Sequence, residues 1–168
     1  FRSYTLGVTN MGAVSINPAI YAKLSFDPLR DFAAVANIGA QDIVLMVHPS
    51  VPANTMQELI ALAKAKPGGL TWASLGYGSH QHITVEWFRT RGIEFHHVPY
   101  KSGPQATTAI VGGEVQILQI GTGQSVPLVR SGKLRAIAVT NQTRSVFALE
   151  VPSFKEAGLD WAVTTWNG

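Results

Sequence analysis

The sequence contains no cysteine, few charged residues and no long apolar run. The absence of cysteine excludes disulfide frameworks and thiolate metal sites. No stretch approaches the roughly 20 apolar residues of a membrane-spanning helix, so we expect no membrane insertion. Charged residues make up 14% of the chain, the net charge is +3, and the basic residues are scattered. Nucleic-acid backbones are bound by clustered positive charge, so we expect small anionic molecules as partners and no nucleic acid.

The length of 168 residues suits one average domain or two small lobes. The chain opens at Phe1, in a strand-like stretch without an initiator Met. We therefore expect it to be a central portion of a longer polypeptide. The lack of a visible signal peptide then says nothing about its compartment.

From residue 52 onward, an apolar strand, a loop of small residues and an amphipathic helix follow one another repeatedly. The clearest helix begins at a capping box, Thr55 with Glu58, and two further helices are predicted to begin at Ser79 and Pro104. Strand–helix alternation with short loops predicts an α/β fold with a mostly parallel sheet. The predicted strands are 70–76, 94–100, 115–121 and 134–140.

The two ends of the chain differ from this pattern. Strands are predicted at 3–10, 42–50 and 161–166, around loop-rich stretches. We therefore expect residues 1–51 to belong to a first lobe, 52–140 to form a second lobe, and 141–168 to return to the first. Two chain crossings between lobes are typical of a hinge.

Small polar residues follow the carboxyl end of each predicted strand of the second lobe. Ligands of doubly wound sheets lie at this edge. Glycines let backbone N–H groups approach a ligand, and helix N-termini add unpaired donors and a positive dipole end. The loops therefore predict a surface for carboxylate or phosphate oxygens, although Gly/Ser loops also simply turn the chain.

The histidines do not match a metal site. His80 and His82 point to different faces of a helix start, and His96 and His97 point to opposite sides of a strand. The stretch 76–80 has neither the serine setting of a nucleophile elbow nor the Lys-Ser/Thr of a phosphate loop. We expect no metal, no cofactor and no catalytic residue.

Several segments, in this order along almost the whole chain, resemble the Bug/TctC family. They are 15–39, 48–82, 96–106, 112–117, 131–145 and 151–159. Members of this family are extracytoplasmic solute receptors of tripartite tricarboxylate transporters. The resemblance implies a periplasmic, non-catalytic protein of the type II periplasmic-binding-protein (Venus flytrap) fold, with one lobe largely complete here and one partial. It also implies a small carboxylate solute, such as a di- or tricarboxylate, an amino acid or an aromatic acid, and membrane transporter subunits as partners.

The family's loop pattern S-x-G-x-G-[TS]-x-x-H falls on residues 74–82. Its strand end VPY-[KR] falls on residues 98–101, and its early loop matches residues 7–11 approximately. By this resemblance the ligand-binding residues are Thr9, Ser74, Gly76, Gly78, Ser79, His82, Tyr100, Lys101 and Thr122.

The chain departs from the family where two aspartates are usual, since Gln116 and Gly121 stand there. The second acid can contact amino groups of zwitterionic solutes, so a plain carboxylate solute is favoured here. The resemblance further implies that about half of one lobe is missing, and we expect such an isolated fragment to bind weakly and to pair with itself through an exposed sheet edge. Two alternatives stay open: an α/β enzyme acting on an anionic metabolite, with Tyr100 and Lys101 in proton transfer, and a ligand-sensing subunit of a signalling system.

Overall fold

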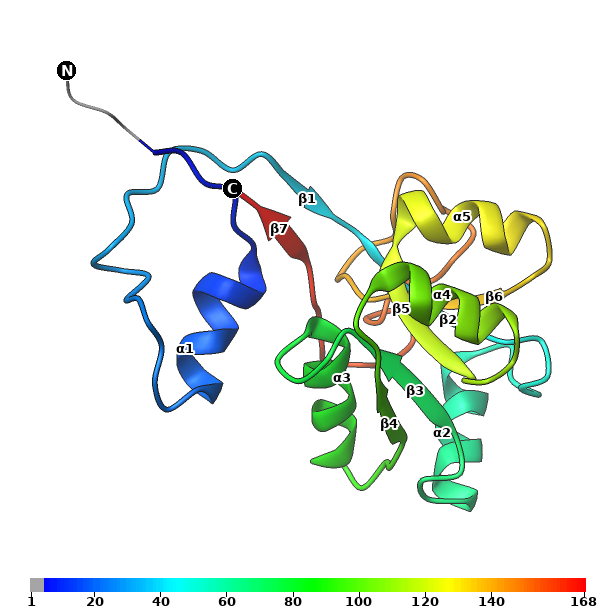
Figure 1. The fold of residues 1–168 in the computed structure, drawn as a ribbon. Helices are drawn as coiled ribbons and strands as arrows, with labels where there is room; N and C mark the ends of the chain where they lie inside the picture. Colours follow the sequence, from blue (N-terminus) through cyan, green and yellow to red (C-terminus); the bar gives the residue numbers. More distant parts are fainter. Residues whose placement is uncertain (1–4) are drawn as a thin grey trace.

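A computed structural model describes residues 5–168 and shows a mixed five-stranded sheet with helices on both faces (Figure 1). The strand order is β4-β3-β5-β2-β6. Strand β2 runs antiparallel to both of its neighbours, whereas β3 is parallel to β4 and to β5. The strands are β2 (Ile43–Val47), β3 (Thr71–Ser74), β4 (His96–Pro99), β5 (Ile117–Gly121) and β6 (Arg135–Val139).

Two pairs of helices cover the sheet. Helices α2 (Met56–Ala65) and α3 (His80–Arg89) contribute to one hydrophobic cluster, which contains the fully buried Trp72 of β3. Helices α4 (Gly103–Val111) and α5 (Thr122–Arg130) pack against the cluster on the other face. Burial on both faces explains why β2 and β5 are continuously apolar or buried along their length.

The predicted helix starts are confirmed. Thr55 Oγ1 accepts a hydrogen bond from Glu58 N at 3.2 Å, and Ser79 Oγ accepts one from His82 N at 3.3 Å. Ser102 caps α4 in the same way, accepting from Gln105 N at 3.4 Å. These side chains satisfy backbone donors that the helix itself leaves unpaired.

A second, small sheet lies to one side of the first (Figure 1). Its two antiparallel strands are β1 (Gly39–Gln41) and β7 (Thr165–Asn167). The π-helix η1 (Gly12–Ile16) and helix α1 (Asn17–Ile20) precede β1. The strand predicted at 3–10 lies partly outside the described residues. In its described part Thr9 exchanges backbone hydrogen bonds with Gly168, and Asn10 forms an isolated bridge.

Both positions at which the chain crosses between the sheets differ from the predicted boundaries. Strand β2, which was expected in the first lobe, lies in the middle of the five-stranded sheet, so the first crossing is at Asp42 rather than near residues 49–52. The reason is physical: Ile43–Val47 is apolar on both faces and is buried only between two helix layers.

The return crossing lies later in the chain than predicted. Ser153 bridges Val139 of β6, and Phe154 is fully buried in the core of the larger sheet. Val163 N still donates to Thr140 O at 2.9 Å, so the chain reaches the small sheet only at β7. Apolar anchors such as Phe154 hold this segment against the five-stranded sheet. Among the described residues, no helix is long and apolar enough to cross a membrane.

Candidate functional site

A cavity of about 650 Å³ lies between the edge of the five-stranded sheet and the segments that carry η1 and β7. Strands β3 and β5 end at this edge and the antiparallel β2 begins there, so the cavity occupies the position expected of ligand sites in α/β sheets. Its lining residues are Asn10, Met11, Gly12, Ala13, Ile16, Asn17, Gln41, Ile43, Leu75, Tyr77, Gly78, Ser79, His80, Gln81, Gly103, Pro104, Ile120, Gly121, Gln124, Thr165, Trp166 and Asn167.

Three helices, α3, α4 and α5, begin at the cavity wall. The positive end of each helix dipole therefore lies at this wall. Some of the first backbone N–H groups are already paired: His82 N with Ser79 Oγ, Gln105 N with Ser102 Oγ and Thr122 N with Asp42 O. No Lys, Arg, Asp or Glu is found among the described residues that line the cavity. Positive potential at this wall therefore comes from helix dipoles rather than from cationic side chains.

The loop between β3 and α3 needs glycine at two positions. Gly76 has φ +99° and Gly78 has φ +80°, a region that L side chains rarely adopt. A Cβ on Gly78 would lie 2.4 Å from Ile20 Cδ1, so this glycine also permits close approach of α1. Ser79 Oγ donates to Gly76 O at 2.7 Å and holds the loop against the helix start.

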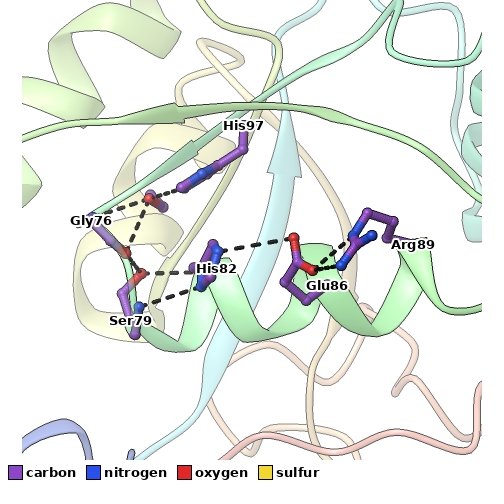
Figure 2. A network of polar contacts seen from close by, with 8 residues as sticks. Gly76, Ser79, His82, Glu86, Arg89 and His97 are labelled. Carbon is purple, nitrogen blue, oxygen red and sulfur yellow. Dashed lines mark hydrogen bonds and ion pairs between the residues drawn. The ribbon is translucent and has the colours of Figure 1, made fainter. Parts of the chain in front are cut away.

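A polar network supports this loop from behind (Figure 2). Ser74 Oγ lies 2.5 Å from His97 Nε2 and accepts from Gly76 N at 3.0 Å. His82 Nδ1 accepts from Gly78 N at 3.3 Å, while its Nε2 lies 3.9 Å from Glu86 Oε1. The network fixes the backbone of the loop, and its side chains do not line the cavity.

The histidines form aromatic contacts in this part of the structure. The rings of His82 and His97 have centroids 4.9 Å apart, and Tyr77 packs edge-on against both. Burial and the neighbouring His82 lower the pKa of His97. Within residues 5–168 no group of three His, Asp or Glu side chains is placed to hold a metal ion.

The predicted ligand-binding residues divide into three sets. Gly78 and Ser79 line the cavity, whereas Ser74, Gly76 and His82 lie in the supporting network. The others do not line it: Thr9, Tyr100, Lys101 and Thr122.

These four residues have structural contacts instead. Tyr100 N donates to Ser74 O at 2.8 Å, and burial raises the pKa of its phenol. Lys101 is exposed, and its backbone N–H donates to Gln105 Oε1 at 3.3 Å. Thr122 is buried at the start of α5, and Thr9 bonds to the far end of the chain.

Sequence reasoning missed several polar side chains of the lining. Burial lowers the pKa of His80 to about 4, against an opposing contact with the backbone of Gln119, so the ring is neutral near pH 7. Gln81 is 1% exposed and yet lines the cavity. The helical start at Ser79 was the available signal, because it places the next two residues on the first turn at the sheet edge.

The two departures from the expected aspartates have different structural consequences. Gln116 Oε1 accepts hydrogen bonds from Thr71 N at 2.8 Å and Thr71 Oγ1 at 3.0 Å, so this side chain joins strand ends. At Gly121, a Cβ would lie 1.8 Å from Gln41 Nε2. The amide of Gln41 thus occupies the space that a side chain at residue 121 would enter.

Residues 2–168 match the model of the tripartite tricarboxylate transporter family receptor. The chain belongs to this family. A protein of Cupriavidus necator, described as the UPF0065 protein in the gbd 5' region, is 36% identical over 138 residues, which are 82% of this chain and 42% of that protein. BugT of Bordetella pertussis is 28% identical over 97% of this chain and 51% of its own length. The chain thus spans about half the length of the curated relatives it matches.

Solved structures show the same fold. A periplasmic transporter structure superposes with a TM-score of 0.88 at 29% identity, covering 96% of this chain and 55% of that one. R. palustris Rpa4515 with adipate gives 0.88 at 28% identity, over 95% of this chain and 54% of that one. MatC from Rhodopseudomonas palustris with bound malate superposes with a TM-score of 0.85 at 26% identity, covering 96% of this chain and 55% of that one. The predicted fold class, a periplasmic-binding-protein α/β fold, is confirmed.

Proposed function

We propose that the protein is a periplasmic receptor that binds a small carboxylate solute in the cavity and delivers it to a tripartite transporter. The observation that carries the proposal is the convergence of three helix N-termini on a cavity whose described lining has no charged side chain. Such a lining suits an anion held by backbone donors. It offers no acid–base pair for catalysis, since His80 is neutral and buried.

The relatives support the same class of solute. Two structures with the same fold, Rpa4515 with adipate and MatC with bound malate, are associated with dicarboxylates. Membership of the receptor family supports periplasmic placement and partnership with membrane transporter subunits. We propose that Gly78 and Ser79, which line the cavity, form part of the wall that the solute contacts, with Ser74, Gly76 and His82 positioning their loop.

The domain arrangement supports closure around the solute. We propose that the segments carrying β1 and β7 form one lobe with the earlier residues, and that the five-stranded sheet forms the other. The cavity lies between them. The chain passes between the two sheets at Asp42 and again just before Thr165, which gives two crossing segments for a hinge.

A thermal-shift screen followed by titration calorimetry tests the proposal. The panel contains mono-, di- and tricarboxylates, amino acids and aromatic acids, with matched neutral amides of the same acids as controls. A carboxylate that binds the native state raises the melting temperature by mass action, and its amide does not. Equal shifts with acid and amide, or no shift with any acid in a protein stripped of bound ligand by unfolding and refolding, would overturn it.

A further inference from the structure

His82 holds the cavity loop through a hydrogen bond that depends on its charge. Gly78 N donates to His82 Nδ1 at 3.3 Å. A backbone N–H needs a lone pair to donate to, so Nδ1 carries no proton and the ring proton is on Nε2. Gly78 is buried and lines the cavity, whereas the His82 side chain is 17% exposed and reaches solvent. This bond to the cavity wall therefore exists only with the neutral ring.

Glu86, one turn further along α3, offers the ring a second partner. His82 Nε2 lies 3.9 Å from Glu86 Oε1, too far for a hydrogen bond. Arg89 occupies the other oxygen, Oε2, with Nε at 2.8 Å and Nη2 at 2.5 Å, so Oε1 is left to accept. His82 thus lies between the loop and a carboxylate (Figure 2), and a charged ring gains by moving toward the carboxylate.

Protonation of His82 removes its bond to the loop. Nδ1 changes from an acceptor into a donor, so two donors face each other at Gly78. A buried N–H that loses its acceptor destabilises the conformation that buries it. The ring of His97 lies with its centroid 4.9 Å from that of His82, and burial, followed by the charge of His82, lowers the pKa of His97. The pair therefore accepts one proton more readily than two.

Titratable and charged groups surround His82 on three elements. They are Tyr77 of the loop, Glu86 and Arg89 of α3, and His97 of β4 with His96 beside it. Tyr77 packs edge-on against both histidine rings and also lines the cavity. A movement of the His82 ring is therefore felt at two adjacent residues of the cavity wall, Tyr77 and Gly78.

Imidazole is the side chain whose charge ordinarily changes between about pH 5 and 8. We infer that His82 is a pH-sensitive switch for the cavity: when it is protonated, its ring releases Gly78 N and turns to Glu86, the loop at residues 76–79 loosens, and the solute binds more weakly. This inference rests on the proposed function, because it concerns the regulation of the same site.

Two measurements at about pH 7.5 and about pH 5.5 test the switch. The first is the protection of the Gly78 amide against hydrogen exchange in the protein without solute, by NMR and corrected for the intrinsic pH dependence. The second is the affinity for malate and adipate by titration calorimetry. Between the two pH values the protection should fall about fivefold or more, the equilibrium value of one hydrogen bond.

His82→Asn is the decisive variant, because Asn Oδ1 can accept from Gly78 N and does not titrate. In this variant the protection of Gly78 should change by less than about twofold between the two pH values, since the bond no longer depends on pH. The ionisation of the acid itself is the same for every variant. We therefore expect the affinity of the unmodified protein to fall about fivefold more than that of His82→Asn.

His48→Asn is the matched control. Ser50 N donates to His48 Nδ1 at 3.2 Å in the same way, and His48 does not line the cavity. This variant should keep the full pH response. Glu86→Gln is a second variant should His82→Asn fail to fold, as verified by circular dichroism; without the carboxylate, the response should move to lower pH.

Equal protection of Gly78 at both pH values, or a pH response that is as large in His82→Asn as in the unmodified protein, would overturn the switch and leave the proposed function standing. Failure of malate, adipate and every other acid of the carboxylate panel to bind at either pH would overturn the proposed function instead. The exchange of Gly78 would then decide alone whether the loop responds to pH.

Discussion

The side-chain amide of Asn141 donates a hydrogen bond to the carboxylate of Asp42. Asp42 lies between β1 and β2, at the first crossing between the sheets, and Asn141 follows the end of β6. Thr164 Oγ1, next to the second crossing, donates to Asn141 Oδ1 at 3.3 Å. Asn141 thus links both crossing segments through opposite ends of one amide.

Removing the hydrogen bond between Asn141 and Asp42 should lower the stability of the protein, and the loss should depend on both residues. We expect Asp42→Ala and Asn141→Ala each to lower the free energy of unfolding by about 1.5–3 kcal/mol, the range for a hydrogen bond to a charged group. Urea denaturation of both single variants and the double variant gives the coupling energy. Strictly additive losses would show that the contact contributes nothing.

Gly78→Val should abolish solute binding in a folded protein. The left-handed backbone at Gly78 disfavours a β-branched side chain, and the new Cβ would collide with Ile20. We expect at least a tenfold loss of affinity, measured by calorimetry. Gly68→Val is the matched control, because Gly68 has φ +68° but lies after α2 in open space. Equal affinity losses in the two variants would assign the effect to general destabilisation.

Phe154→Ala should destabilise the five-stranded sheet by about 3–5 kcal/mol, the usual loss for a buried phenylalanine. Phe154 is 0% exposed, whereas Phe147 in the preceding loop is 69% exposed. Phe147→Ala is therefore expected to change the free energy of unfolding by less than about 0.5 kcal/mol. Chemical denaturation followed by tryptophan fluorescence measures both. A small effect at residue 154 would contradict the packing of the return segment on β6.

Stability should rise with pH between about 4 and 6.5 because of His80. Its pKa of about 4 in the folded protein lies below the ordinary histidine pKa of 6.5, so the unfolded chain binds the extra proton across this window. The contribution is fully present above the unfolded pKa and is lost as pH falls toward the folded one; it amounts to about 3 kcal/mol at most. The lowered pKa of His97 acts in the same direction.

The test compares the pH dependence of unfolding in the unmodified protein and in His80→Gln. In the variant, the free energy of unfolding should rise much less steeply with pH between about 4 and 6.5. The part of the pH dependence that comes from His97 should remain. Identical slopes would show that His80 is not buried as a neutral ring.

Local signals predicted the helices of the larger sheet well. The capping box of Thr55 with Glu58, the cap at Ser79 and the helix-start proline at residue 104 are signals between residues close in sequence, so they are readable from it. The position of β2 was not readable. An apolar run of five residues fits a strand buried between any two layers, and its antiparallel pairing with β5 is a long-range contact.

In the candidate site too, residues of one local motif were predictable from the sequence, whereas those that depend on long-range contacts were not. Gly78 and Ser79 were predicted because they belong to a contiguous loop motif. Gln41 was missed, since its approach to Gly121 depends on the chain entering the larger sheet at Asp42. His80 and Gln81 lie inside the motif, but their burial depends on β5 lying against α3, a long-range contact in which Gln81 Nε2 donates to Gln119 O.

The two edge strands of the five-stranded sheet, β4 and β6, affect how readily another chain can add a strand to it. Strand β4 is four residues long and ends in Pro99, which has no N–H to offer an incoming strand. On the opposite side, Val139 N donates to Pro152 O and Phe154 N donates to Val139 O, so the return segment covers the end of β6. Strand addition is thus disfavoured at Pro99 of β4 and at the covered end of β6.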